Sequence, residues 1–314
     1  MPHVWLNNGL VDESQAAISV RDAGLLHAAG VFTTMRACSG QVFRLADHLR
    51  RLRASCDAFS IPLPYPDDVL AGAISDVLGK NELAEARLRL TVTRGAPGET
   101  GTHLVPNVLL SASPFQAYPA VYYHKGMTVV VLDQQKLNPY DFQAGHKTLN
   151  YLSRLAALRD AGARGAGEAL WFDVHNQLQS GSISNVFIVR GTDILTPPAA
   201  DDLADPVLAA AIPWKRSAVL PGITRRVVLE LCRTHHLSAH PAAINIETLL
   251  SADEVFLTNS IMGLMPVCRI ERHAVGGDRP GPVYSRLAEL YENELKRTLA
   301  GDSGTEAQRH GGTK

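Results

Sequence analysis

The sequence predicts a two-domain protein of mixed helices and strands, and three observations lead to this prediction. A length of 314 residues exceeds the usual size of a single domain. Short runs typical of strands occur together with longer amphipathic runs typical of helices. The 46% of hydrophobic and 19% of charged residues are typical of globular proteins. We expect a smaller N-terminal domain over residues 1–118, a larger domain over 119–300, and a disordered polar tail over 301–314.

Composition also excludes several kinds of partner. A formal net charge of −1, without a basic stripe, argues against binding to nucleic acid or to a membrane surface. The four cysteines are widely spaced and form no CxxC pair, so we expect reduced thiols and no metal site. We find no signal peptide and no apolar run that would span a bilayer, and the expected location is the cytoplasm.

The N-terminal domain is predicted to contain strands and two helices. A turn over residues 7–9 leads into strand-like runs around Ile18 and Val31. An apolar stripe that starts at Leu45 predicts a helix packed on a sheet, with His48, Arg51 and Ser55 along one flank. Three further segments have clear patterns, namely a second helix at Asp67–Leu78, a strand at Ala86–Thr93 and a glycine-rich loop at Arg94–Gly101.

The second domain is predicted to follow a linker rich in proline and tyrosine at residues 113–126. Its expected strands are residues 127–132, a hairpin from 168 through 179, 185–189 and 254–257. Its expected helices cover residues 150–161, a segment after Pro221 and residues 280–299. The alanine- and aspartate-rich residues 199–211 are interpreted as a surface insertion.

Lys147 is the strongest candidate for a catalytic residue. It lies between a turn of small residues and the start of the helix predicted near Asn150. A lysine held there in a pocket that lowers its pKa can form a Schiff base with a carbonyl cofactor. For a lysine taken alone, a solvated position in a loop is the more common explanation. The choice between a catalytic and a solvated lysine therefore depends on the surrounding motifs.

Seven blocks of the chain occur in the order in which a known family has them. They span about 245 residues and are Asp22–Arg36 (DAGLLHAAGVFTTMR), His48–Leu52 (HLRRL), Thr91–Gly95 (TVTRG), Gly145–Leu152 (GHKTLNYL), Ser182–Phe187 (SISNVF), Pro221–Arg225 (PGITR) and Phe256–Val267 (FLTNSIMGLMPV). Together they resemble the class IV aminotransferases, which are pyridoxal-phosphate enzymes of fold type IV. The resemblance implies an α+β fold like that of D-amino acid aminotransferase, a small amino substrate and a homodimer. Lys147 would form the Schiff base and then act as general base and acid.

The resemblance also implies which residues hold the cofactor. The phosphate would be bound by residues from several blocks, namely Arg51, Ile223, Thr224, Thr258 and Asn259. Ser180, Asn185 and Gly222 are further expected cofactor-binding residues. A planar guanidinium suits a phosphate, and the N-terminus of a helix that begins near Thr224 favours an anion. A solvated helix arginine at Arg51 and a simple N-cap threonine at Thr224 are the alternatives. Tyr151 would donate to the phenolate oxygen of the cofactor.

One position departs from the family pattern. Five residues before the asparagine of the SNVF-type motif, here Asn185, the family has a glutamate that keeps the pyridine nitrogen protonated. This chain has Ser180 there. Strand alternation directs the adjacent Gln179 to the opposite face. A serine offers only a neutral hydrogen bond, so we expect an unprotonated ring nitrogen and a weaker electron sink.

Ser180 leads to a hypothesis about the reaction. The 4-amino-4-deoxychorismate lyases of this family expel pyruvate and form aromatic 4-aminobenzoate, and aromatisation would compensate for a weak sink. The stretch Phe32-Thr33-Thr34 has threonine where many transaminases of the family have glutamate, and it favours the lyase, as does the segment NSIMGLMPV. Phe32 and Thr34 are candidates for contacts with the substrate. Arg94 is a candidate for the substrate carboxylate. The alternatives are an aminotransferase for branched-chain or D-amino acids, and a member that binds the cofactor with lost or altered activity.

Overall fold

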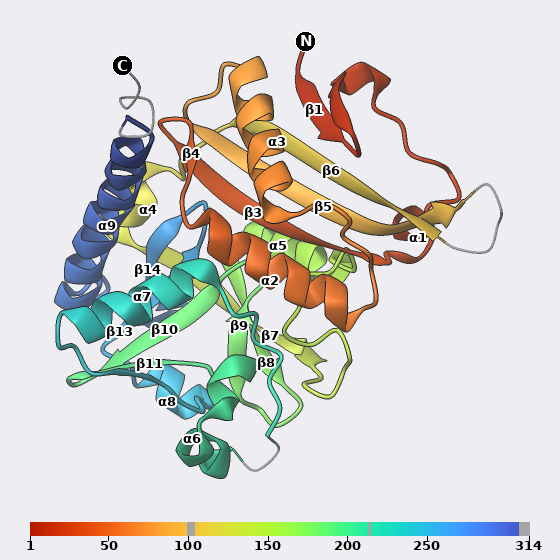
Figure 1. Cartoon of the computed structure of the whole chain (residues 1–314). Helices are drawn as coiled ribbons and strands as arrows, with labels where there is room; N and C mark the ends of the chain where they lie inside the picture. The colour runs from red at the N-terminus through yellow and green to blue at the C-terminus, as the bar shows by residue number, and fades with distance from the viewer. Residues whose placement is uncertain (99–103, 213–214, 308–314) are drawn as a thin grey trace. The chain divides into compact units, whose positions relative to one another are not determined.

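The computed structural model describes residues 1–98, 104–212 and 215–307 (Figure 1). The chain divides into two compact units. Unit 1 consists of Met1–Gln116, Lys147–Asn150 and the C-terminal residues from Asn293, and unit 2 consists of Ala117–His146 and Tyr151–Glu292. The segment that carries Lys147 therefore belongs to the N-terminal unit, an excursion that a division of the sequence at residue 118 does not anticipate.

Unit 1 is a six-stranded sheet in the order β2-β1-β6-β5-β3-β4, with helices packed on it. Its elements are β1 (His3–Leu6), β2 (Gly9–Asp12), η1 (Glu13–Gln15), α1 (Ala23–His27), β3 (Gly30–Cys38), β4 (Gln41–Val42), α2 (Leu45–Ala58), α3 (Asp67–Lys80), β5 (Ala86–Pro97) and β6 (Leu104–Pro114). The apolar stripe of α2 lies where the sequence predicted it. Leu49, Leu52 and Cys56 pack with Val31 and Met35 of β3 in the core of this unit.

The lysine segment is bound to the N-terminal half of β3. The backbone N–H of Phe32 donates to the carbonyl of Lys147 (2.9 Å), and Leu149 N–H donates to the carbonyl of Gly30 (2.9 Å). A Cβ at Gly30 would lie 2.6 Å from Leu149 Cδ1 and 2.7 Å from a backbone oxygen of β5, so only glycine allows this approach. Lys147 is thus fixed by strand-like backbone bonds to β3.

The structure corrects several boundaries in and after the first unit. Ile18 lies between η1 and α1 in irregular backbone, so the strand predicted there is wrong. Arg94 belongs to β5, which continues through Pro97, and residues 99–101 of the predicted loop lie outside the described residues. The predicted linker contains a short helix, α4 (Ala120–Lys125). The last helix, α9 (Pro282–Ala307), extends into the expected tail, whose residues 308–314 are not described.

Unit 2 is organised around a nine-stranded sheet in the order β12-β11-β10-β13-β14-β7-β8-β9, with β15 beside β14. Its strands are β7 (Met127–Leu137), β8 (Glu168–Asp173), β9 (Leu178–Gly181), β10 (Asn185–Arg190), β11 (Asp193–Thr196), β12 (Ala239–Pro241), β13 (Glu254–Asn259), β14 (Gly263–Ile270) and β15 (His273–Ala274). Its further helices are α5 (Leu152–Ala163), η2 (Ala200–Ala204), α6 (Pro206–Ala211), α7 (Ile223–Thr234) and α8 (Ile246–Leu250).

Two strands that are distant in this sheet are joined by a very short connection. β9 is the last strand of the order and β10 is the third from the other end, yet only residues 182–184 separate them in the chain. Gly181 N–H donates to the carbonyl of Ser184 across this turn (2.9 Å). The sheet must therefore curl to bring these two strands together.

The apolar interior of both units is made largely by these strands and helices. All four cysteines, Cys38, Cys56, Cys232 and Cys268, are buried and unpaired, and burial raises the pKa of the Cys56 thiol to about 12.

Among the helices of the described chain, none combines the length and apolar character that crossing a bilayer would require.

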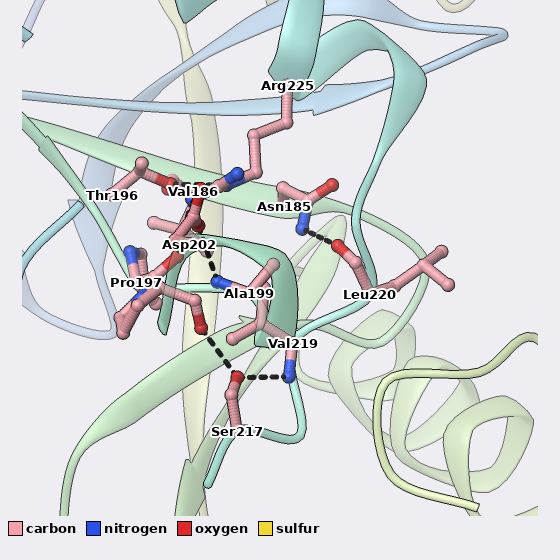
Figure 2. A network of polar contacts seen from close by, with 11 residues as sticks. Asn185, Val186, Thr196, Pro197, Ala199, Asp202, Ser217, Val219, Leu220 and Arg225 are labelled. Atoms are coloured by element: carbon pink, nitrogen blue, oxygen red, sulfur yellow. Dashed lines mark hydrogen bonds and ion pairs between the residues drawn. The ribbon is translucent and has the colours of Figure 1, made fainter. Parts of the chain in front are cut away.

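A buried ion pair connects η2 to α7 in unit 2 (Figure 2). Arg225 is 4% exposed, and its guanidinium donates to Asp202 at 2.6 Å, to the carbonyl of Pro197 at 3.1 Å and to Thr196 Oγ1 at 3.3 Å. The same oxygen of Asp202 accepts the backbone N–H of Ala199 at 2.7 Å. The segment interpreted as a surface insertion is therefore held against the first turn of α7.

We expect Asp202→Asn to lower the free energy of unfolding by roughly 2–3 kcal/mol, because it leaves the charge of Arg225 buried without its counter-ion. Urea unfolding of the full chain measures this loss. Asp76→Asn is the control, since Asp76 is exposed on α3 and remote from Arg225 in the chain, and should change stability by less than about 0.5 kcal/mol. Equal losses for the two variants would contradict the assignment.

Candidate functional site

Two cations flank the ring of Phe32 in unit 1. The Nζ atom of Lys147 lies 4.7 Å from the ring centroid, and the guanidinium carbon of Arg89 lies 3.6 Å from it. Phe32 is 5% exposed, and Arg89 also donates to Thr91 Oγ1 at 3.1 Å. The structure thus brings the predicted catalytic lysine to a predicted substrate residue, and adds an arginine that can bind an anion.

A hydrogen-bonded triad lies on the helix side of β3. Thr33 Oγ1 accepts from Arg51 Nη2 at 3.1 Å and lies 2.8 Å from His48 Nδ1. An arginine can only donate, so the Thr33 hydroxyl accepts from Arg51, and the same hydroxyl contacts Nδ1 of the buried His48. Burial, then the charges of Arg51 and Lys147, hold the pKa of His48 well below its usual value. Arg51 is a partner of this triad, not a solvated helix arginine.

Two predicted substrate residues lie at different places on the same sheet. Thr34 pairs with Arg89 across β3 and β5, which places it beside the cationic group at Phe32. Arg94 lies further along β5, where its side chain is exposed and its backbone N–H donates to the carbonyl of Ala29. Arg89, and not Arg94, is therefore the arginine that lies with Lys147 at Phe32.

The N-terminus of α7 in unit 2 has the features of an anion-binding cradle. Gly222 is the N-cap, and no side chain of the described residues caps the helix, so the N–H groups of Ile223 and Thr224 remain available. A Cβ on Gly222 would lie 1.9 Å from Asn185 Oδ1. Asn185 Nδ2 in turn donates to the carbonyl of Leu220 at 3.0 Å, which holds the segment before the helix on β10 (Figure 2).

Thr258 supplies a hydroxyl next to this cradle. It pairs with Asn185 across β13 and β10 and is 1% exposed, and its Oγ1 is buried without a hydrogen-bond partner among the described residues. A buried hydroxyl without a partner costs free energy, so a retained one indicates a ligand. The neighbouring Asn259 is different, because its amide donates to the carbonyl of Ile183 and accepts from the N–H groups of Ile261 and Met262.

These residues fit a phosphate. Uncapped helix N–H groups and a helix dipole favour an anion, a glycine allows close approach of the backbone, and the Thr258 hydroxyl adds a donor. The N-cap alternative for Thr224 is wrong, since the N-cap is Gly222 and Thr224 lies inside the first turn. Asn259 instead holds the neighbouring turns in place.

Ser180 faces an arginine, not a carboxylate. Arg154 Nη1, from α5, lies 3.4 Å from Ser180 Oγ, 3.1 Å from the carbonyl of Gly181 and 3.2 Å from that of Ser182. Tyr151 donates to the same carbonyl of Ser182 at 3.3 Å. Gln179 bonds elsewhere, to Asp173 at 2.9 Å and to the N–H of Ala218 at 3.1 Å, in agreement with the predicted alternation.

Glu168 holds the other side of the same turn. Its carboxylate is fully buried and accepts from the N–H groups of Ala169, Ser182 and Ile183 and from Ser184 Oγ, at 2.9–3.2 Å. Burial raises the pKa of Glu168, and the hydrogen bonds oppose that shift. Since all four partners donate, the ionised carboxylate is the form that this site fits.

The residues that sequence reasoning missed are Arg89, Arg154 and Glu168, together with the role of His48. Each lies in a strand or helix whose pattern explains it as an ordinary surface or core position. Arg89 alone gave a signal, because ARLRLTVT places an arginine on the face opposite the core leucines.

Comparison with known proteins assigns the family. Residues 30–270 match the sequence profile described as amino-transferase class IV, which covers most of the chain. The chain belongs to this family. It is 28% identical to the D-alanine aminotransferase of Bacillus licheniformis over 93% of this chain and 96% of that protein. It is also 28% identical to the branched-chain-amino-acid aminotransferase of Salmonella typhimurium over 92% and 91% of the two chains.

Comparison with solved structures supports the same family assignment. The branched-chain amino acid aminotransferase of T.th. with pyridoxamine 5′-phosphate superposes with a TM-score of 0.82 at 25% identity, covering 94% of each chain. The 4-amino-4-deoxychorismate lyase of Pseudomonas aeruginosa superposes with a TM-score of 0.77 at 26% identity, covering 93% of this chain and 99% of that one. The fold type IV prediction is confirmed, and the protein is a pyridoxal-phosphate-dependent enzyme.

His48 predicts a pH dependence of stability. Its pKa is lowered in the folded state, so below about pH 6.5 the unfolded chain takes up a proton that the folded chain does not. This contribution to the free energy of unfolding therefore falls by up to about 1.4 kcal/mol per pH unit as the pH drops below that value. His48→Asn, which keeps an acceptor near Thr33, should remove this slope in urea unfolding between pH 7.5 and 5.5. The exposed His124→Asn should retain it, and an unchanged slope in His48→Asn would refute the assignment.

Thr258→Val should act in opposite directions on stability and binding. The free protein loses only a hydroxyl without a partner, so its stability should be unchanged or higher. Affinity for pyridoxal phosphate, measured by absorbance titration, should fall about tenfold or more, because a hydrogen bond to a charged group is lost. Thr196→Val is the contrast, since that hydroxyl donates to the carbonyl of Val186 at 2.8 Å and its removal should destabilise the fold.

Proposed function

We propose that the protein removes a proton next to the amino group of a small amino carboxylate and expels pyruvate, converting 4-amino-4-deoxychorismate to 4-aminobenzoate. The observation that carries this proposal is the contact between Ser180 and Arg154, where a carboxylate would otherwise stabilise a protonated ring nitrogen. A serine held by a cation favours a reaction that has its own driving force. The lyase of Pseudomonas aeruginosa, with which the chain superposes, supports the same choice.

The cofactor supplies an aldehyde that takes up an amine and a ring that delocalises the electron pair left by a departing proton. The chain supplies the rest. Lys147 Nζ would be the amine that attaches the cofactor. As a free amine it would be the base that removes the proton and the acid that returns one to the leaving enolpyruvyl group. Arg89 lies against the same Phe32 ring as Lys147, so a second cation accompanies this amine.

The N-terminus of α7, Gly222 and Thr258 would hold the phosphate. Tyr151 would donate to the phenolate oxygen, and its single proton would then leave the carbonyl of Ser182, to which it is directed in this structure. Arg89 is the residue of unit 1 best placed to bind a carboxylate of the substrate near Lys147, because both lie against Phe32. Thr34, its cross-strand neighbour, adds a hydroxyl and no opposing charge.

A second candidate keeps the cofactor and changes the reaction. The chain is 28% identical to the D-alanine and branched-chain aminotransferases cited above and 26% identical to the lyase, so overall identity does not separate the two reactions. Under this alternative the chain would transfer the amino group of a branched-chain or D-amino acid to a keto acid.

The two reactions are distinguished by their products. We expect purified holoenzyme to release pyruvate and 4-aminobenzoate from 4-amino-4-deoxychorismate. A coupled lactate dehydrogenase assay measures the pyruvate, and fluorescence measures the 4-aminobenzoate. Lys147→Ala should lower the rate at least ~1000-fold, because both the covalent attachment and the proton transfer are lost. Borohydride reduction and peptide mapping should label Lys147 in the wild type only.

Lys125→Ala is the control for these assays, since Lys125 is exposed on α4. Exchange between amino acids and keto acids without pyruvate release would favour the aminotransferase. Cofactor binding with neither reaction would identify a member with lost or altered activity. Failure of the wild type to bind pyridoxal phosphate would refute the proposal as a whole.

A further inference from the structure

Arg154 is a partly buried cation whose only described partners are neutral oxygens and a ring. It donates to Ser180 Oγ and to the carbonyls of Gly181 and Ser182, and its guanidinium carbon lies 5.5 Å from the centroid of Trp171. Within the described chain it forms no ion pair, because the nearby buried carboxylate of Glu168 is occupied by four N–H and O–H donors.

The guanidinium fixes the direction of the Ser180 hydroxyl. An arginine has five N–H donors and no acceptor, so Ser180 Oγ must accept in this contact. The single proton of Ser180 is then directed away from Arg154. At 3.4 Å the bond is long, and the positive charge of the donor strengthens it. Ser180 is 4% exposed, so solvent does not compete freely for that proton.

We propose that Arg154 is a positioning residue that makes Ser180 a hydrogen-bond donor to the ring nitrogen of pyridoxal phosphate and keeps this nitrogen unprotonated. The inference rests on the proposed placement of Ser180 at that nitrogen. The absence of the usual glutamate removes one group that would stabilise a protonated ring nitrogen. Arg154 adds a second effect, because its fixed positive charge disfavours a further positive charge on that nitrogen.

The charged and titratable groups around Ser180 agree with an unprotonated ring nitrogen. Arg154 approaches from α5, and Tyr151, which precedes the same helix, donates to the carbonyl of Ser182. Glu168 approaches from β8 but is directed to the N–H side of the turn. Burial lowers the pKa of Arg154 from its usual value, and the nearby Tyr151 and Glu168 oppose this shift. A guanidinium group keeps its proton in proteins, so Arg154 remains charged at neutral pH.

Arg154 should interfere with a simple restoration of the family pattern. In Ser180→Glu the new carboxylate would pair with Arg154 before it could pair with a protonated ring. Ser180→Glu alone should therefore protonate the nitrogen only in part, whereas the double variant Ser180→Glu/Arg154→Met should protonate it fully. A role of Arg154 confined to holding the two carbonyls predicts no such difference.

The test is the ¹⁵N chemical shift of ring-labelled pyridoxal phosphate bound to the holoenzyme, followed against pH. We expect the wild type to show an unprotonated, hydrogen-bonded nitrogen at neutral pH. Arg154→Met should raise the pKa of this nitrogen by about 1–2 units, as removal of a unit charge a few ångströms away implies. Arg154→Lys, which keeps the charge, should restore the wild-type shift. Arg159→Met is the matched control, an exposed arginine on the same helix.

The possible outcomes separate the role of Arg154 from the proposed function. If the wild type binds no cofactor, the proposed function is wrong. If the wild type and Arg154→Met show identical ¹⁵N chemical shifts at every pH, only the role of Arg154 is wrong. If Arg154→Met does not fold, Ser180→Ala replaces it: the nitrogen should stay unprotonated and lose its hydrogen-bond shift, and an unchanged resonance would overturn the inference.

Discussion

The turn at residues 182–184 depends on one buried carboxylate. Glu168 accepts all of its hydrogen bonds from the N–H and O–H groups of this region, and a buried charge is tolerated only when it is satisfied in this way. The turn joins β9 to β10, which are distant in the sheet order, so its geometry decides how the sheet curls. Ser180, Gly181 and Asn185 obtain their positions from it.

The two sides of this turn receive opposite charges. Glu168 binds the N–H groups, and Arg154 binds the carbonyls and the Ser180 hydroxyl. Neither charge needs to contact the other, because the backbone dipoles between them satisfy both. Gly181 is required here, since a Cβ would lie 2.2 Å from Ser184 Oγ and 2.8 Å from Glu168. A cation beside the position where the family has a carboxylate makes this region electronically different from the family pattern.

Unit 1 follows the same principle with a different set of groups. Thr33 accepts a hydrogen bond from Arg51 and contacts the buried imidazole of His48, whose pKa burial and the neighbouring cations lower. Backbone bonds to β3 fix Lys147 nearby, at the ring of Phe32. Each unit thus contains a buried hydroxyl group that accepts a hydrogen bond from an arginine.

Sequence alone determined the five longer helices (α2, α3, α5, α7 and α9), most strands, the family, the cofactor and the candidate lysine. Periodicity fixes which face of α2 is buried, and the motif order identifies the family because such short blocks recur together only in related chains. The sequence also identified Ser180 as a departure from the family pattern, which has a glutamate at this position. Only the tertiary structure decided what Ser180 faces, that the buried hydroxyl of Thr258 has no partner among the described residues, and that Arg89 and not Arg94 accompanies Lys147. These facts depend on the register of strands and on contacts between segments far apart in the chain, and neither is encoded in local spacing.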